Sequence, residues 1–283
     1  MKNIFRLIIL IILSGFGCAG SPNQASQGEK PPLEIANLRD IPQDALEELS
    51  KKFDGSEVYI VVHPSYYIFF HEKGRDILPD EQKSLVETFV ETEYGDTGVL
   101  YLMKEYQKAE MQLISSAKDK KRLVVLLIPG HYTTSSHYIF KDGQDGYAQY
   151  INGLTRDTDS VFYIESKSVN SGKMLEDDQK ALLNFLSKIR AQKVYIGGGY
   201  IGRCQKDFYN FLSKAWSENN IAIIPEISAF SPEDLSDSTA RMLLTSNMKL
   251  NSSVVNSFIT NGRVKRLETI RPNVKNIPIS EIQ

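Results

Sequence analysis

The chain has 283 residues, and its 33 Lys and Arg nearly balance its 35 Asp and Glu, which gives a formal net charge of −2. So mild a charge, without a block of basic residues, argues against a nucleic-acid partner, and the length is enough for one large domain. Beyond Cys18, which lies near the N-terminus, the only cysteine is Cys204. We therefore expect no intramolecular disulfide, and the fold must depend on its core.

Residues 1–17 have the composition of a secretory signal peptide. Lys2 and Arg6 are their only charges, and the apolar run that begins at Leu7 is too short to span a bilayer. The sequence SGFGCAG around Cys18 resembles a bacterial lipoprotein signal, in which small residues precede a cysteine that is lipid-modified. This resemblance implies a lipid on Cys18, a membrane lipid as partner and an extracytoplasmic place in the cell envelope. An ordinary cleaved leader and an uncleaved anchor are the alternatives.

Three further segments are expected after the leader. Residues 18–33 form the lipidated N-terminus and a flexible tether, because SPNQASQGEKPP is polar and rich in Pro, Gly, Ser and Gln. Residues 34–262 form the folded domain. Residues 263–283 form a C-terminal tail with little periodicity. A globular domain held away from a membrane is what such a tether suits.

Strands and helices alternate along the predicted domain. Apolar residues at helical spacing predict helices at residues 41–53, about 80–90, 99–113, 175–190 and 204–215. Continuous β-branched and apolar runs predict buried strands at residues 58–62, 122–128, 161–164, 194–196 and 221–224. Residues 131–160 contain several glycines and no clear periodicity, so a long irregular segment is expected there. The alternation predicts a Rossmann-like three-layer α/β sandwich with a mainly parallel sheet and helices on both faces.

Polar residues of catalytic type follow the predicted strands. His63 and His131 each come after a buried run, Glu165 and Lys167 follow a third, and Cys204 opens a helix behind a glycine loop. Parallel strands present their carboxyl ends on one side, so these residues are expected to converge on one edge of the sheet. Each also has a plain reading: turn-capping histidines, a surface ion pair and a core cysteine.

The order of these residues resembles that of the isochorismatase-like cysteine hydrolases over about residues 58–229. VFYIESK leads to Lys167 and VYIGGGYIGRC leads to Cys204, with a predicted helix between them. The resemblance implies that Cys204 is a nucleophile for an amide or ester and that Lys167 assists it. The position of the family's aspartate base holds His63, so hydrolysis requires His63 in that role. Backbone N–H groups of residues 202–204 would then form the oxyanion hole.

The glycine loop also has the spacing of a dinucleotide-binding motif. Gly197, Gly199 and Gly202 form G-x-G-x-x-G between a predicted strand and helix, and Glu226 would be the ribose-binding acid. Dinucleotides are scarce outside the cytoplasm, and Glu226 lies further along the chain than the motif requires. Dinucleotide binding is therefore a second alternative.

The interpretation we favour is a non-enzymatic envelope protein whose domain binds a small anionic ligand or another envelope protein. It ranks above hydrolysis because the aspartate base is missing and the chain is tethered. No cofactor is expected. No metal is expected either, because none of the four histidines lies at the i, i+4 spacing of a known metal motif. The histidines are His63, His71, His131 and His137.

Overall fold

The computed structural model describes residues 33–66, 95–117, 120, 122–130, 141–168 and 171–229, with the single residues 257, 261 and 275. These residues belong to one unit, Pro31–Gln283. The predicted leader, Cys18, the helix expected near residues 80–90 and His131 lie outside the described residues. Within the described part, no helix has both the length and the apolar character needed to cross a bilayer.

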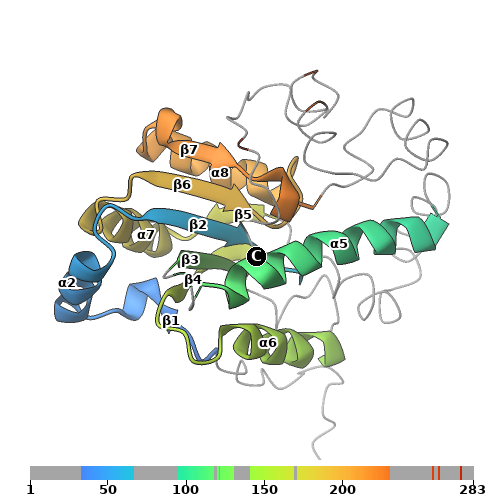
Figure 1. Ribbon diagram of the computed structural model, residues 1–283, viewed down its shortest axis with the longest axis horizontal. Coiled ribbons are helices and arrows are strands. Elements are labelled where there is room, and N and C mark those ends of the chain that lie inside the picture. The colour runs from blue at the N-terminus through green and yellow to red at the C-terminus, as the bar shows by residue number, and fades with distance from the viewer. Residues whose placement is uncertain are drawn as a thin grey trace, which may run out of the picture. The chain divides into compact units, whose positions relative to one another are not determined.

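A seven-stranded sheet forms the centre of the domain (Figure 1). The strand order is β1-β4-β3-β2-β6-β7, and every neighbouring pair in this path is parallel. β5 lies outside the path and pairs antiparallel with β4. The strands are β1 Ala36–Asn37, β2 Glu57–Val62, β3 Leu123–Pro129, β4 Val161–Ser168, β5 Ser171–Met174, β6 Lys193–Gly197 and β7 Ile221–Ile223. The first strand, β1, lies beside β4. From β2, near the middle of the sheet, the chain then extends through β3 to β4 on one side and returns to β6 and β7 on the other.

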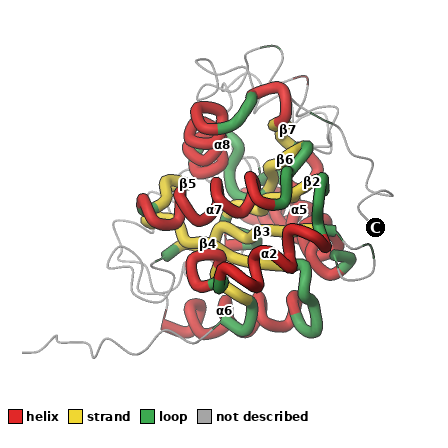
Figure 2. The backbone as a smooth tube through the Cα atoms, turned by 90° about the vertical axis from the view of Figure 1, so that its left-hand side faces the viewer, coloured by secondary structure: helices red, strands yellow, loops and turns green. Residues whose placement is uncertain are grey.

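Helices cover both faces of this sheet (Figures 1 and 2). The α-helices are α2 Gln43–Lys52, α5 Gly95–Ser115, α6 Lys141–Thr155, α7 Glu176–Lys188 and α8 Cys204–Ala215. Short 3-10 helices are η1 Leu38–Asp40, η4 Glu218–Asn220 and η5 Pro225–Ile227. α2, α7 and α8 pack with one side of the strands, and α5 and α6 pack with the other. This arrangement confirms the predicted α/β fold with a mainly parallel sheet and helices on both faces.

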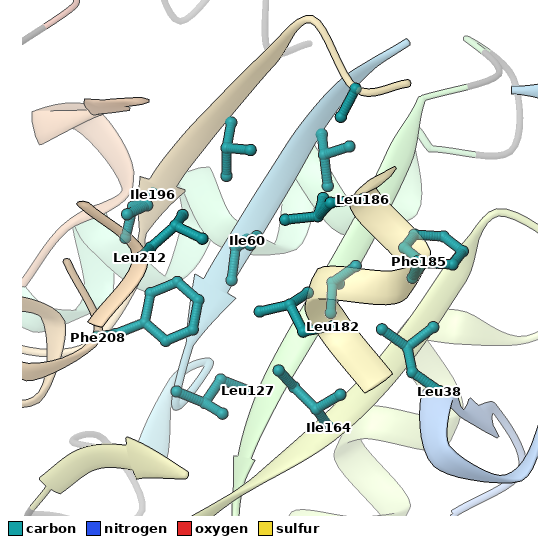
Figure 3. Close-up of a cluster of buried hydrophobic side chains, with 14 of the residues drawn as sticks. Leu38, Ile60, Leu127, Ile164, Leu182, Phe185, Leu186, Ile196, Phe208 and Leu212 are labelled. Atoms are coloured by element: carbon teal, nitrogen blue, oxygen red, sulfur yellow. The ribbon is translucent and has the colours of Figure 1, made fainter. Parts of the chain in front are cut away.

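Two apolar clusters, one on each face, hold the layers together. Along β2, Ile60 belongs to the cluster with α7 and α8, and its neighbour Val61 belongs to the cluster with α5 and α6. This alternation explains why the strands read as continuous apolar runs, since both of their faces are buried. Figure 3 shows the first cluster, with the labelled side chains Leu38, Ile60, Leu127, Ile164, Leu182, Phe185, Leu186, Ile196, Phe208 and Leu212.

The expectation of irregular structure at residues 131–160 was wrong for α6. Three glycines hide the periodicity of this helix, although Tyr147, Ala148 and Ile151 share a buried face. The end predicted for the strand at residues 161–164 was also wrong. β4 continues four residues further than predicted, to Ser168, and β5 returns beside it as an antiparallel strand. The other strands were predicted from continuous apolar runs, and the residues of this hairpin are too polar to form such a run.

The β4–β5 hairpin packs its backbone directly against α8. A Cβ atom at Gly172 would clash with the backbone O of Cys204 and lie 3.0 Å from the backbone N of Phe208. Ser171 Oγ also donates a hydrogen bond of 2.8 Å to Asp207 Oδ2. Only glycine therefore lets β5 and the first turn of α8 approach this closely.

We predict opposite effects for two Gly→Ala substitutions. Gly172→Ala should destabilise the fold by about 1–3 kcal/mol, because the added methyl group forces the hairpin away from α8. Gly153→Ala, in α6, should stabilise it by about 0.5–1 kcal/mol, because no atom lies within 4 Å of its Cβ position and alanine favours helix. Chemical denaturation of both variants measures these changes. Equal stability of Gly172→Ala and the natural chain would contradict the backbone contact.

Candidate functional site at the switch point of the sheet

The direction of chain winding reverses between β2 and β6. In doubly wound sheets, ligands bind outside the carboxyl ends of the two strands that flank such a point. Here these ends continue into residues 63–66 after β2 and residues 198–203 after β6. The candidate site is therefore built from these two loops and from the groups that hold them.

The loop after β2 contains two residues in an unusual backbone conformation. His63 has φ +45° and Ser65 has φ +54°, the left-handed region that non-glycine residues rarely adopt. Such conformations cost about 1–3 kcal/mol each and persist only where the surroundings impose them. Tyr66 N donates to His63 O at 3.1 Å, and Tyr147 Oη donates to Pro64 O at 2.9 Å, so neighbouring groups fix this turn.

A fully buried carboxylate holds Ser65. Glu110 Oε2, on α5, accepts hydrogen bonds from Ser65 N at 2.7 Å and from Ser65 Oγ at 2.9 Å. Ser65 Oγ also lies 2.9 Å from Tyr150 Oη on α6. Because the serine proton goes to Glu110, the tyrosine donates in this second bond. Burial raises the pKa of Tyr150, so its phenol stays neutral and able to donate.

The ring of His63 is hydrogen-bonded to β4. Its Nε2 lies 2.8 Å from Ser166 Oγ, and Ser166 Oγ donates to Ser168 O at 3.0 Å. A hydroxyl has one proton, so Nε2 must carry the imidazole proton and donate to Ser166. Burial lowers the pKa of His63 to about 3, and the ring is therefore neutral near pH 7. A general base works best with a pKa near the working pH, so this environment disfavours the base role.

The glycine loop after β6 packs against the end of β2. Gly198 and Gly199 have φ +70° and +56°. A Cβ at Gly198 would lie 2.5 Å from Val62 O, and a Cβ at Gly199 would lie 2.7 Å from Cys204 Sγ. A Cβ at Gly197 would overlap the side chain of Ile227. Close packing and left-handed backbone thus account for this glycine run without a bound phosphate.

The thiol of Cys204 lies inside the apolar cluster beneath α8. The residue is 4% exposed, and its Sγ accepts a hydrogen bond of 3.3 Å from Tyr200 N. Burial raises the pKa of Cys204 to about 11, although it opens α8. The sulfur and His63 both lie near the end of β2, yet the histidine bonds Ser166 and not the thiol. The thiol therefore remains protonated at neutral pH.

The other predicted site residues have different surroundings. Lys167 is exposed on β4, and its side chain makes no hydrogen bond or ion pair with the described residues. Glu226 is buried in η5, after β7, and Gly202 is buried in the glycine loop. Lys167 thus does not join the thiol and imidazole within the part of the chain that the structure describes. Among those same residues, no group of three or more His, Cys, Asp or Glu could hold a metal ion.

Several residues of the site were missed from the sequence. Glu110 lies on the buried face of α5, between Tyr106 and Leu113, where a charged residue is a detectable anomaly. Ser166 follows Ile164 by two residues and lies on the same buried side of β4. Gln205 also escaped notice: its Nε2 donates to Gly198 O at 2.7 Å and to Ser228 Oγ at 2.9 Å.

We predict that His63 makes stability depend on pH. The pKa of an unfolded histidine is about 6.5, and burial lowers that of His63 to about 3. Its contribution is therefore fully present above pH 6.5 and is lost as the pH falls from there toward 3, at up to about 1.4 kcal/mol per pH unit. His63→Gln keeps a donor for Ser166 and removes this titration.

Urea unfolding of the natural chain and His63→Gln at several pH values between 7.5 and 4.5 measures this contribution. The difference between the two curves cancels the carboxylates that titrate in both proteins. We expect the natural chain to lose stability faster than the variant below pH 6.5. Parallel curves over the whole interval would contradict a buried neutral imidazole.

Comparison with known proteins gives no functional assignment. No protein-family model and no curated protein matches this chain. The resemblance to isochorismatase-like hydrolases therefore stays a prediction. Function must be inferred from the residues at the switch point and from the N-terminal sequence.

Proposed function

We propose that the chain is a lipid-anchored envelope protein whose α/β domain binds a small polar ligand or a partner protein at the ends of β2 and β6, without covalent catalysis. The observation that carries this proposal is the state of Cys204. Its sulfur is packed among apolar side chains, accepts a hydrogen bond from Tyr200 N and has its pKa raised to about 11. An attacking cysteine needs an accessible thiolate, and these surroundings favour the opposite form.

The strained loop after β2 supports binding at this place. Two residues with left-handed backbone, His63 and Ser65, lie in a turn that is maintained by a buried carboxylate and two tyrosines. Strain of this kind concentrates at functional sites, where it holds groups ready for a ligand. The switch point is also where ligands bind in related architectures, although that argument rests on fold alone.

The anchor is supported by the N-terminal sequence. A charged start, a short apolar run, small residues and Cys18 follow one another in the order of a lipoprotein signal. A polar segment then leads to Ile35 and Leu38, whose side chains belong to the clusters on opposite faces of the sheet. The chain is thus packed into the core of the domain directly after the proposed tether.

The reactivity of Cys204 distinguishes binding from hydrolysis. In a Cys18→Ser chain, where Cys204 is the only thiol, we expect a disulfide reagent such as DTNB to react at pH 8 at least about a hundredfold more slowly than with the unfolded chain. The reason is that burial leaves little thiolate at this pH. Stopped-flow absorbance of native and urea-unfolded protein measures the two rates.

Hydrolysis of p-nitrophenyl acetate by the same Cys18→Ser chain is the companion measurement, with Cys204→Ala added as the matched variant. We expect no activity that depends on Cys204. Rapid native labelling together with esterase activity lost in Cys204→Ala would replace the binding proposal with the cysteine-hydrolase alternative.

The two cysteines also provide a matched test of anchoring. In a bacterial host fed radiolabelled palmitate, the natural chain should be labelled and recovered with membranes. Cys18→Ser should lose both properties, whereas Cys204→Ser should keep both, because only Cys18 lies in the signal. Label retained by Cys18→Ser would exclude this cysteine as the lipid attachment site.

The same membranes allow binding to be measured. After detergent extraction, native mass spectrometry should detect a non-covalent ligand or a stoichiometric partner on the natural chain, and His63→Gln should reduce its occupancy. Lys173→Met, which changes an exposed lysine on β5, is the control. Extracts in which the natural chain carries neither ligand nor partner would count against the proposed function.

A further inference from the structure

The strand β7 is the last strand of the sheet on the side away from β4. Ile224 N donates to Ile196 O on β6 at 2.8 Å, so the backbone groups of the preceding residue, Ile223, face the other way. An unpaired sheet edge of this kind is a template for pairing with a second chain. Whatever contacts Ile223 on this side therefore decides whether the edge is open.

Lys275 contacts this edge through its backbone. Its N–H donates a hydrogen bond of 3.0 Å to Ile223 O. The bond joins a residue near the C-terminus to the outer side of β7. The predicted tail of residues 263–283 is thus attached to the domain at this residue.

The side chain of Lys275 extends from the edge toward the middle of the sheet. Its Nζ donates to Tyr195 Oη at 2.8 Å and lies 4.7 Å from the centre of the tyrosine ring. Tyr195 Oη in turn donates to Glu57 Oε1 on β2 at 2.8 Å. Ala222 of β7 is the cross-strand partner of Tyr195, and its small side chain leaves room for the lysine.

The donors and acceptors match along the hydrogen bonds from Lys275 through Tyr195 to Glu57. The single proton of the Tyr195 hydroxyl goes to the carboxylate of Glu57, so its oxygen accepts from the ammonium. Burial raises the pKa of Tyr195, which keeps the phenol neutral between the two charges. On its other side the ring contacts Tyr59, with centres 5.1 Å apart, and the Arg122 guanidinium lies over Tyr59. Cations therefore lie at both ends of the aromatic pair.

We propose that Lys275 is a latch, which holds the C-terminal segment on β7 and prevents this edge from pairing with a second copy of the chain. The backbone bond to Ile223 occupies the edge. The hydrogen bond to Tyr195 Oη and the contact with its ring fix the Lys275 side chain in place. Protection of the β7 edge therefore depends on this side chain. This role does not require a ligand at the switch point, because the hydrogen bonds of Lys275 go to Ile223 and Tyr195 and not to residues 63–66 or 198–203.

Hydrogen exchange measured by mass spectrometry on the full chain tests the latch. Lys275→Met keeps the length of the side chain and removes its charge and hydrogen bond. We expect the peptide that contains residue 275 to exchange about tenfold faster or more in this variant, with faster exchange in β7 as well. Tyr195→Phe, which keeps the ring and loses both hydrogen bonds, should give a smaller increase in the same peptides. Lys173→Met, an exposed lysine on β5, should change neither.

The second measurement is the association state. In sedimentation velocity, we expect the natural chain and Lys173→Met to be monomers. Deletion of residues 263–283 should produce a dimer or a larger species. Unchanged exchange in both Lys275→Met and Tyr195→Phe would overturn the latch, even if the deleted chain does not fold. A folded, monomeric deletion variant whose β7 exchanges at the natural rate would overturn the protection of the edge.

Discussion

The hydrogen bonds from Ser65 to the buried carboxylate of Glu110 determine the shape of the candidate site. A buried charge of this kind is costly unless it is well paired, and here both the backbone and the side chain of one serine pair with it. The bonds tie α5 to the end of β2, the strand that lies between β3 and β6. Together with the bonds from Tyr66 N to His63 O and from Tyr147 Oη to Pro64 O, they hold the left-handed backbone of His63 and Ser65 in place.

The surroundings of Cys204 argue against the cysteine-hydrolase activity that the sequence pattern suggests, although the predicted α/β fold is present. Cys204 stands at a strand-to-helix junction, where a helix N-terminus favours a thiolate. Burial has the larger effect, since it raises the pKa of the thiol to about 11 despite that position. His63 is hydrogen-bonded to Ser166, and its own pKa is lowered by burial. The same junction therefore serves packing: Gly199 lets the sulfur lie under the loop, and Gly172 lets β5 lie over the first turn.

The sequence predicted those elements whose residues are buried along their whole length. Strands such as β3 are apolar on both faces, so their runs predict the parallel sheet, and the parallel sheet places His63 and Cys204 near one edge. Pairwise partners could not be predicted in this way. The bond between His63 and Ser166 joins residues far apart in the chain, and it depends on the polar extension of β4. Glu110 could have been found, because a carboxylate on the apolar face of α5 requires a partner.

The close approach of the glycine loop to β2 has a mechanical consequence. The backbone of Gly198 lies against the Val62 carbonyl, directly before His63, and Gln205 fastens the same glycine to Ser228. Interiors packed to this density transmit displacement and do not absorb it. A molecule that pushes on either turn therefore moves its neighbour too, and the two chain reversals behave as one stiff unit.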